Sequence, residues 1–399
     1  MNVAVMGYGT IGSGVVEILR VNADIIAKRA GVPLKVTKVL DLRDFGDDPI
    51  SSLIVHDYKE IADDPDIDIV VETMGGVEPA YTFVKAMLES GKHVTTSNKA
   101  LVADKGAELI RIAREHEVNF LFEASVGGGI PIIRVLDKCL TGDVVEEITG
   151  IVNGTTNFMM TKMTDEGSEF DDVIKEAQSL GYAEKDPTAD IEGHDACRKI
   201  AILTSLVSGA QVDYQDIPTE GISHISATDI KYAAAMGRKI KLLASSKVSG
   251  DTYYCRVAPY LLPPEHPLFN VEGVFNAVFV RGNMLGDSMY YGSGAGKLPT
   301  ASAVVGDIVE MAKHVHMNVY LEWHEEKLTL ADPKAQSFRN FVRTSADRSE
   351  IESIFSDLQF VDAGISGETG FVTAELTESE MDEKLGKLGD KVLSRIRLG

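Results

Sequence analysis

The chain has 399 residues, 44% of them hydrophobic, which is enough for two or three domains with substantial cores. Its formal net charge of −22 argues against a nucleic-acid or anionic-membrane partner, because both are bound by basic surfaces. Cys139, Cys197 and Cys255 are odd in number and far apart, which indicates a reducing, cytoplasmic compartment without disulfides or a zinc site. No apolar run reaches membrane length, and a strand expected from residue 2 leaves no room for a signal peptide.

The N-terminal stretch MNVAVMGYGTIGSGVVEILR predicts a buried strand, a glycine turn and an amphipathic helix. Gly7, Gly9 and Gly12 match the G-x-G-x-x-G pattern of dinucleotide-binding domains. In that pattern the first glycine permits the turn, the second lets the backbone approach a pyrophosphate, and the third allows close helix–strand packing. Because the phosphates would lie over the helix N-terminus, we also expect Thr10 and Ile11 to contact the cofactor.

The second predicted strand, LKVTKVLD at residues 34–41, leaves the choice of cofactor open. It ends at Asp41, where an acidic residue ordinarily binds the ribose hydroxyls of NAD. Arg43 follows two residues later and could instead bind the 2′-phosphate of NADP. The sequence therefore predicts NAD or NADP without choosing between them.

Strands and helices then alternate, which predicts a doubly wound parallel sheet of Rossmann type. The expected strands are 66–76, 92–97 and 119–125, and the expected helices are 78–91 and 105–118. Ligands bind beyond the carboxyl ends of such strands. The residues expected on that side are Gly75, Gly76, Ser97, Asn98, Lys99 and Ser125. Lys99 is interpreted either as a neighbour of nicotinamide and substrate or as an ordinary surface lysine.

The stretch GYAEKDPTADIEGHDACRK, residues 181–199, concentrates charge before an apolar helix predicted at 196–207. Lys199 falls on the apolar stripe of that helix, and Asp195 lies one turn earlier on the same face. The pair is either a buried structural ion pair or a proton donor held by a carboxylate. Glu184 and Asp190, upstream in the loop, could hold an ammonium group of the substrate.

These motifs resemble the homoserine dehydrogenase family over at least residues 1–320. The resembling blocks are VVETMGGVEPA, GKHVTTSNKAL, FEASVGGGIPIIR, GIVNGTTNFMMTKM, GYAEKDPTADIEGHDACRK and YGSGAGKLPTASAVVGD, in family order. The resemblance implies reversible reduction of aspartate 4-semialdehyde to homoserine by a nicotinamide cofactor, in threonine and methionine synthesis.

The resemblance also implies roles for single residues. Lys199 matches the catalytic lysine that exchanges the hydroxyl proton, Lys99 matches a lysine beside nicotinamide and substrate, and Asp190 matches a carboxylate close to the site. Further positions match substrate or cofactor contacts. They are Glu184, Asp195, Asn153, Gly154, Thr155 and Tyr182 for the substrate, and Gly181, Gly294 and Gly296 for the cofactor.

A monovalent metal ion, usually sodium, is the third implication of the resemblance. The matching positions are Glu123, Val126, Gly128 and Ile130, which would contribute mostly main-chain carbonyls to a structural ion. Nothing in the side chains themselves indicates this site. One departure concerns the cofactor: many bacterial members have an arginine where this chain has Leu40, which leaves NAD or dual use open.

The predicted architecture has three parts. Residues 1–133, completed by a helix at 299–320, form the nucleotide domain, and residues 134–298 form an α+β domain for substrate binding and dimerisation. Residues 325–399 predict a βαββαβ order that resembles an ACT domain. The Asp-x-Pro-Gly turn usual there is replaced by residues 345–348, so we interpret the segment as a dimer-contact or stability module rather than a threonine sensor. The resemblance further implies a homodimer or a dimer of dimers.

Two other functions remain open at this stage. The chain could be a different semialdehyde or amino-acid dehydrogenase on the same frame, or an inactive sensor of nucleotide and amino acid. The 181–199 block argues against the first alternative, because it carries substrate recognition as well as chemistry. The joint presence of Lys99, Glu184, Asp190, Asp195 and Lys199 argues against the second.

Overall fold

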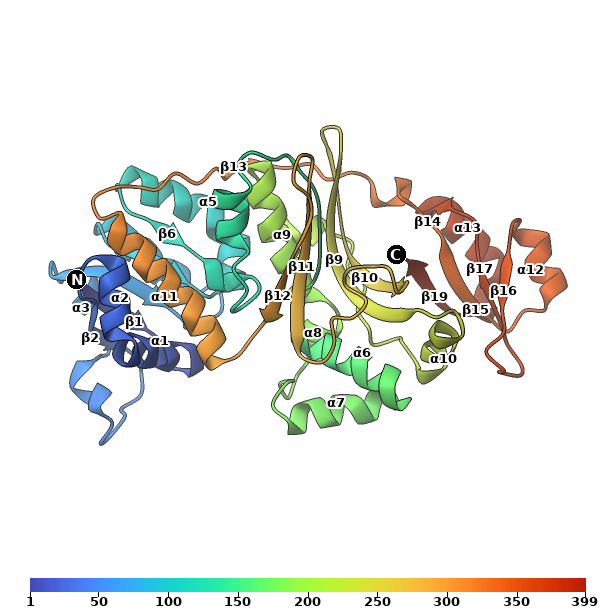
Figure 1. Cartoon of the computed structure of the whole chain (residues 1–399), viewed down its shortest axis with the longest axis horizontal. Helices are drawn as coiled ribbons and strands as arrows, with labels where there is room; N and C mark the ends of the chain where they lie inside the picture. Colours follow the sequence, from blue (N-terminus) through green and yellow to red (C-terminus); the bar gives the residue numbers. More distant parts are fainter. The chain divides into compact units, whose positions relative to one another are not determined.

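The computed structural model describes all 399 residues and divides them into two compact units (Figure 1). Unit 1 consists of Met1–Val144, Ala201–Tyr214 and Tyr290–Leu328. Unit 2 consists of Val145–Ile200, Gln215–Met289 and Thr329–Gly399. The C-terminal residues, expected as a domain of their own, thus lie in the same compact unit as most of the middle segment. No helix combines the length and apolarity needed to cross a membrane.

Unit 1 is built on a six-stranded sheet in the order β3-β2-β1-β4-β5-β6, with every pairing parallel. This confirms the predicted doubly wound fold, whose strand order reverses between β1 and β4. The strands are β1 (Asn2–Met6), β2 (Lys35–Leu40), β3 (Ile54–Val55), β4 (Ile67–Glu72), β5 (His93–Thr96) and β6 (Phe120–Leu121). The last expected strand is shorter than predicted, because the chain turns into a 3₁₀ segment, η2, at Glu123–Ser125.

Helices α1 and α11 pack side by side in unit 1 (Figure 1). Their contact is close because a Cβ on Gly14 would lie 3.0 Å from Cβ of Ala301 and 2.9 Å from the carbonyl oxygen of Lys297. Val304, Ile308 and Met311 of α11 enter the same core as Val3 and Val5 of β1. The helices of unit 1 are α1 (Thr10–Val21), α2 (Ala23–Ala30), α3 (Lys59–Ala62), α4 (Ala80–Glu89), α5 (Lys99–Glu115) and α11 (Lys297–Lys313).

Short elements complete unit 1. They are η1 (Pro49–Leu53), a π-helical turn η3 (Val135–Cys139), and the parallel two-stranded pair of β8 (Ala210–Gln211) and β13 (His324–Lys327). The indole nitrogen of Trp323, just before β13, donates to the side chain of Gln211, which links the two segments.

A nine-stranded mixed sheet, in the order β12-β11-β7-β9-β10-β19-β15-β17-β16, is the centre of unit 2. Its strands are β7 (Val145–Ile151), β9 (Lys239–Ser249), β10 (Thr252–Leu262), β11 (Phe275–Gly282), β12 (Gly286–Ser293), β15 (Asn340–Thr344), β16 (Gln359–Val361), β17 (Thr369–Val372) and β19 (Val392–Leu398). The division between the units falls within β12.

The helices around this sheet are mostly short. They are α6 (Gly154–Glu166), α7 (Phe170–Ser179), α8 (Thr188–Ile191), α10 (Ala227–Ala235), α12 (Arg348–Ile354) and α13 (Glu378–Leu388). Helix α9 (His194–Ser208) belongs to unit 2 as far as Ile200 and to unit 1 from Ala201. The remaining pieces are η4 (Tyr214–Asp216), η5 (Pro333–Ala335), η6 (Gly389–Lys391) and the antiparallel pair of β14 (Ser337–Phe338) and β18 (Leu376–Thr377).

The C-terminal segment has the predicted βαββαβ order, formed by β15, α12, β16, β17, α13 and β19. Val342, Phe371, Ile351 and Met381 form its own small core between helices and strands. Its last strand continues the larger sheet, because β19 pairs antiparallel with β15 and parallel with β10. At residues 345–348, where the effector turn was expected to be missing, Asp347 caps α12 by accepting a hydrogen bond from the Glu350 N–H.

A buried group of charges lies where β19 meets β10. The guanidinium of Arg397 donates to both carboxylate oxygens of Glu378 at 2.6 and 3.0 Å and to both of Glu220 at 2.7 Å. Arg395 adds a third hydrogen bond to Glu378, and Arg256 lies 3.8 Å from it. Burial by itself would raise the pKa of Glu378, but these guanidinium groups lower it to about 2.

We expect Glu378→Gln to destabilise the protein by about 3 kcal/mol at pH 7, because it removes the buried carboxylate that Arg256, Arg395 and Arg397 share. A carboxyl whose pKa is depressed on folding adds stability above its unfolded value near 4.5, and that stability is lost as pH falls toward 2. The gap between wild type and variant should therefore shrink below about pH 4.5, as measured by urea unfolding with circular dichroism.

The matched control is Glu383→Gln on the same helix, where the exposed carboxylate pairs only with Lys387. It should change stability by less than about 0.5 kcal/mol. An equal effect of the two substitutions, or a gap independent of pH, would contradict the role given to Glu378.

Candidate active site

The predicted glycine turn of unit 1 has the geometry that its sequence requires. Gly7 has φ +95°, which a residue with a Cβ rarely adopts. A Cβ on Gly12 would lie 1.9 Å from the carbonyl oxygen of Gly7, so helix and turn could not approach as they do. A Cβ on Gly9 would meet nothing within 4 Å, so space remains above this residue. The turn is thus tight at Gly7 and Gly12 and open at Gly9.

The N-terminus of α1 suits an anion. Gly9 caps the helix without a side-chain hydrogen bond, and no acidic residue lies in the first turn. The N–H groups of the first turn, which include those of Thr10 and Ile11, therefore point toward the open space without a competing carboxylate. Both observations fit the pyrophosphate of a dinucleotide, and the assignment of Gly7, Gly9, Thr10, Ile11 and Gly12 to one phosphate cradle stays a prediction.

Asp41 and Arg43, the two candidates for contacting the adenosine ribose, bind each other. The Nε and Nη2 atoms of Arg43 each donate to one oxygen of Asp41 at 2.9 Å, and Nη2 also donates to the Tyr8 carbonyl. Asp41 additionally accepts the N–H of Tyr8, next to the glycine turn. The hydrogen bond from Arg43 holds the pKa of Asp41 well below its usual range. The guanidinium remains largely exposed and the carboxylate is buried.

Glu72, which the sequence reading missed, organises the carboxyl ends of β4 and β5. It is fully buried, and burial raises its pKa. Its carboxyl group accepts the N–H groups of Met74 and Gly75 and the hydroxyl of Thr96. Thr96 in turn accepts the N–H of Asn98, which caps α5 and so places Lys99 at its first position. The available signal was an acidic residue directly after the apolar run Ile69–Val71 at the end of β4.

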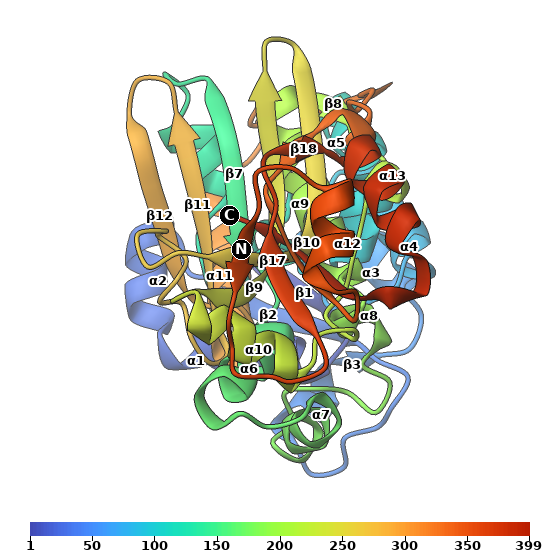
Figure 2. The same cartoon turned by 90° about the vertical axis from the view of Figure 1, so that its right-hand side faces the viewer.

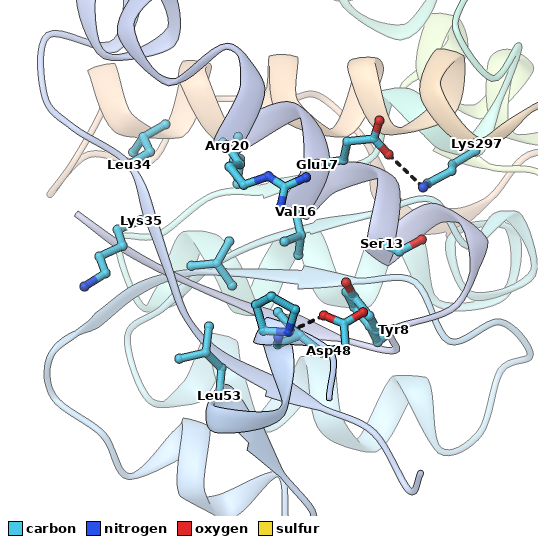
Figure 3. Close-up of a pocket in the computed structure, with 14 residues that line it drawn as sticks. Tyr8, Ser13, Val16, Glu17, Arg20, Leu34, Lys35, Asp48, Leu53 and Lys297 are labelled. Atoms are coloured by element: carbon cyan, nitrogen blue, oxygen red, sulfur yellow. Dashed lines mark hydrogen bonds and ion pairs between the residues drawn. The ribbon is translucent and has the colours of Figure 1, made fainter. Parts of the chain in front are cut away.

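The cavity of about 510 Å³ on unit 1 does not coincide with these residues. Its walls come from the outer face of α1, the start of β2 and the segment around η1, and Figure 3 shows Val16, Glu17 and Arg20 on one wall. Lys297 closes one end through an ion pair with Glu17 at 2.7 Å. Tyr8, between Gly7 and Gly9, is the one residue of the glycine turn that lines this cavity. The phosphate cradle is therefore an open surface at the helix end rather than this pocket.

In unit 2 the predicted lysine and aspartate form a buried contact on α9. Lys199 is 8% exposed and Asp195 is 3% exposed. The Lys199 Nζ donates to Oδ2 of Asp195 at 2.7 Å and to the carbonyl oxygen of Val152 at 2.6 Å. Val152 directly follows β7, so a strand end and a helix face together hold the ammonium group. The predicted placement of Lys199 on the apolar stripe is thereby confirmed.

Asn153 connects this pair to the loop carboxylate Asp190. Its side-chain amide donates to Oδ1 of Asp190 at 2.7 Å and to Oδ2 of Asp195 at 2.9 Å. Its side-chain oxygen accepts the Thr156 N–H and caps α6. One amide therefore fixes two carboxylates beside the lysine and also starts the helix. Lys199, Asp195, Asn153 and Asp190 form what we call the lysine cluster.

The remaining predicted substrate residues surround the start of α6 to different degrees. The Thr155 hydroxyl donates to the carbonyl of Tyr182, which ties the 181–199 loop to α6. Gly154 packs on β11, because a Cβ there would lie 2.8 Å from the Val274 carbonyl. The side chains of Tyr182 and Glu184 are exposed, and neither donates to or accepts from the lysine cluster.

The glycine-rich segment after η2 surrounds a buried carboxylate. Both oxygens of Glu123 are fully used: they accept the N–H groups of Ile132, Ile133 and Arg134 and the Nε of Arg134. The guanidinium also lies 3.4 Å from Asp307, whose pKa burial raises to about 7. No group of three or more His, Cys, Asp or Glu side chains could hold a metal ion.

The predicted sodium site would rely on main-chain carbonyls, and the backbone here is closely packed. Gly127 and Gly128 have positive φ, and Gly128 lies so close to Gly294 that a Cβ would be 2.3 Å from its carbonyl oxygen. The backbone of two loops therefore comes very close at this point. The binding of a sodium ion by the main-chain carbonyls of Glu123, Val126, Gly128 and Ile130 stays a prediction.

We expect Gly9→Ala to weaken dinucleotide binding at least tenfold while leaving the melting temperature within about 2 °C. The new methyl group meets no protein atom, but it occupies the approach of the pyrophosphate. Gly12→Ala should lower both binding and melting temperature, because its Cβ would overlap the Gly7 carbonyl. Fluorescence titration with a reduced nicotinamide dinucleotide and thermal melting distinguish the two. Equal loss of stability in both variants would contradict the open cradle.

Comparison with known proteins gives the same family for both matched parts of the chain. Residues 7–123 match the family model described as homoserine dehydrogenase, NAD binding domain, and residues 131–309 match homoserine dehydrogenase. The chain is 41% identical over 368 residues to a homoserine dehydrogenase of Bacillus subtilis, covering 90% of this chain and 85% of that protein. It is 44% identical to one of Neisseria gonorrhoeae, covering 79% and 73%.

The fold agrees as well. A crystal structure of a homoserine dehydrogenase from Thiobacillus denitrificans superposes with a TM-score of 0.91 at 37% identity, covering 100% of this chain and 98% of that one. A hyperthermophilic archaeal homoserine dehydrogenase in complex with NADPH superposes with a TM-score of 0.65 at 32% identity, covering 78% and 97%. The chain therefore belongs to the homoserine dehydrogenase family and is an NAD(P)-dependent oxidoreductase.

Proposed function

We propose that Lys199 carries the proton in the homoserine dehydrogenase reaction, the reversible NAD(P)-dependent reduction of aspartate 4-semialdehyde to homoserine. The observation behind this assignment is the buried ammonium of Lys199, held between the Val152 carbonyl and Asp195. A carbonyl oxygen that is reduced to a hydroxyl needs one proton, and a fixed ammonium group can give it. In the reverse direction the neutral amine takes the same proton back.

A nicotinamide dinucleotide held at the Gly7–Gly12 turn would supply the hydride to the aldehyde carbon in reduction and would accept it from the alcohol carbon in oxidation. Each turnover then moves one hydride and one proton, so the balance closes when Lys199 is reprotonated from solvent. Asp195 accepts a hydrogen bond from the Lys199 Nζ and so holds it in position, and Asn153 keeps Asp195 in place. The Val152 carbonyl fixes the direction of the ammonium group.

Substrate recognition follows from the acidic groups around the cluster. The α-ammonium of the substrate needs carboxylates, and Asp190 and Glu184 supply them on the 181–199 loop. The α-carboxylate needs N–H donors, and the N-terminus of α6 at Gly154 and Thr155 offers them. Lys99, at the first position of α5, is assigned to the carbonyl end of the substrate and the nicotinamide. We assign Gly181, Gly294 and Gly296 to contacts with the cofactor.

A purely structural role is the competing interpretation of the Lys199–Asp195 pair. Buried ion pairs are expensive to desolvate and add little to stability compared with apolar residues. Two carboxylates and an amide gathered around one lysine therefore fit a chemical role better than a stabilising one. The same reasoning argues against an inactive sensor. A dehydrogenase of another semialdehyde would be distinguished by comparing turnover of the two substrates.

The choice between NAD and NADP rests on the Asp41–Arg43 pair. The NADPH bound to the archaeal relative favours NADP as one substrate of this chain too. The exposed guanidinium of Arg43 can turn toward a 2′-phosphate, while Asp41 can accept ribose hydroxyls when Arg43 moves away. We therefore propose that the enzyme uses both cofactors.

Three further assignments complete the proposal. A sodium ion held by carbonyls of Glu123, Val126, Gly128 and Ile130 would be structural, because it has no open position for chemistry. A homodimer is supported by the exposed Met284 and Leu285 on the β11–β12 hairpin, which are 80% and 56% exposed. The acidic surface and scattered cysteines fit a cytoplasmic enzyme.

Lys199→Ala should reduce kcat by about 10²–10⁴-fold, the range of general acid–base catalysis, and leave cofactor affinity unchanged. The measurement is the homoserine-dependent appearance of reduced nicotinamide absorbance, with dinucleotide binding followed separately by fluorescence. Lys185→Ala, which removes an exposed lysine of the same loop, is the control and should keep wild-type turnover. Turnover of Lys199→Ala within tenfold of wild type would leave the lysine a structural role.

Arg43→Ala should lower kcat/KM for NADP at least tenfold more than for NAD, since it removes the cation within reach of a 2′-phosphate. Asp41→Ala should lower kcat/KM for NAD more than for NADP, because it removes the acceptor for the ribose hydroxyls. Initial rates with homoserine and each cofactor measure both ratios. Equal losses of kcat/KM with NAD and NADP would show that neither residue distinguishes the two cofactors at the ribose.

A further inference from the structure

A short irregular segment of unit 2, residues 217–222, lies alongside β10. Thr219 forms a single parallel bridge with Val257 of that strand. The Glu220 N–H donates to the Val257 carbonyl at 2.8 Å, and the Val257 N–H donates to the Pro218 carbonyl at 2.9 Å. Further along β10, from Tyr260, the last strand of the chain, β19, pairs with it (Figure 2). The segment and β19 therefore follow each other along one strand.

On one side the segment contacts the corner between α8 and α9. The N–H of Ile222 donates to the carbonyl of Ile191 at 2.7 Å. A Cβ on Gly221 would lie 2.1 Å from the same carbonyl oxygen and 2.5 Å from Cα of Glu192. Two stretches of backbone therefore touch with no side chain between them. In such close packing a displacement of one stretch must displace the other.

This corner separates the two carboxylates of the lysine cluster. Asp190 is the third residue of α8, and Asp195 is the second residue of α9. The side-chain amide of Asn153 donates to both carboxylates, at 2.7 and 2.9 Å. One amide can reach both only while the two helices keep their separation, which the corner sets. The position of Asp195, and with it that of Lys199, therefore depends on the corner.

On the other side the segment is fixed by the side chain of Glu220. The Nη1 and Nη2 atoms of Arg397 donate to its two carboxylate oxygens, each at 2.7 Å, so the ion pair is bidentate. Burial by itself would raise the pKa of Glu220, but Arg397 holds it below its usual value. The guanidinium is buried and is held by Glu378 as well. A fixed cation of the C-terminal segment therefore anchors residues 217–222.

We propose that Glu220 is a positioning residue for the lysine cluster, because its ion pair with Arg397 fixes the segment that holds the corner. The inference rests on the proposed catalytic role of Lys199. It adds to that role a residue which acts through the backbone rather than through substrate or cofactor. It also gives the last strand of the C-terminal segment a part in catalysis.

A purely stabilising role is the alternative, and Glu378 provides the comparison. Glu220 and Glu378 bind the same guanidinium group, so removing either carboxylate weakens the same buried charge group. The side chain of Glu378 is bound by guanidinium groups of β10 and β19 and lies on α13. Only Glu220 belongs to the segment that contacts the corner. Stabilisation would give the two residues the same effect on turnover, whereas positioning would not.

Glu220→Gln should lower kcat for homoserine oxidation about tenfold and leave dinucleotide affinity unchanged, because the glycine turn belongs to unit 1. Glu378→Gln is the matched control and should keep kcat within about twofold of wild type, although it lowers the melting temperature at least as much. Initial rates with saturating homoserine and NAD or NADP measure kcat. They are taken at a temperature at which circular dichroism shows every variant folded, and fluorescence titration gives the affinity.

Combination with Lys199→Ala tests whether Glu220 acts through the cluster. Two changes that impair the same catalytic group are not additive. Adding Glu220→Gln to Lys199→Ala should therefore lower kcat by less than about twofold further. Glu220→Asp keeps the negative charge and should lose less kcat than Glu220→Gln, and it replaces that variant in each comparison if the glutamine form does not fold. A residue that only stabilises the fold would show neither effect.

Three outcomes would overturn the proposal. They are a kcat of Glu220→Gln within about twofold of wild type, equal losses of kcat in Glu220→Gln and Glu378→Gln, and a further tenfold loss when Glu220→Gln is added to Lys199→Ala. Each of them leaves the assignment of Lys199 intact, because Lys199→Ala alone tests it. An active Lys199→Ala would instead remove the proposed proton carrier and this inference together, so the two failures are distinguishable.

Discussion

The lysine cluster of unit 2 depends on one buried charge, the ammonium group of Lys199. A charged lysine that is 8% exposed would be costly to desolvate without a carboxylate and a carbonyl in contact with it. Asp195 and Val152 supply these contacts, and Asn153 then has to satisfy Asp195 as well as cap α6. The end of β7, the start of α6 and the buried face of α9 are therefore fixed together by one charge.

Buried carboxylates play a comparable role elsewhere in this acidic chain. Glu72 gathers the loops after β4 and β5, Glu123 gathers four N–H donors after η2, and Glu378 joins three guanidinium groups at β19. A carboxylate accepts up to four hydrogen bonds, so a single side chain can order a whole loop. In each case the groups that it orders come from segments that a sequence pattern treats separately.

The difference between patterns within one element and contacts between separate segments explains which features could be predicted from the sequence. The glycine turn, the strand alternation and the position of Lys199 are local patterns, because spacing within one element determines them. Glu72 and the Glu123–Arg134–Asp307 contacts are partnerships between distant residues, and only their identity as acidic residues was visible. The family resemblance located Glu123 through its carbonyl. It gave no indication that the side chain is fully occupied by N–H groups.

The C-terminal segment illustrates the same limit at the level of domains. Its βαββαβ order could be predicted from its own pattern, but its relation to the rest of unit 2 depends on pairing between β19 and β10. A parallel pairing has no turn signal, and the Arg397 contacts with Glu220 and Glu378 join residues 177 and 19 positions apart. A detached sensor module would need neither feature. The shared sheet and shared charges instead make the segment part of the scaffold that carries β7 and β9. Any ligand bound to the C-terminal strands therefore acts on a continuous structure rather than across a linker.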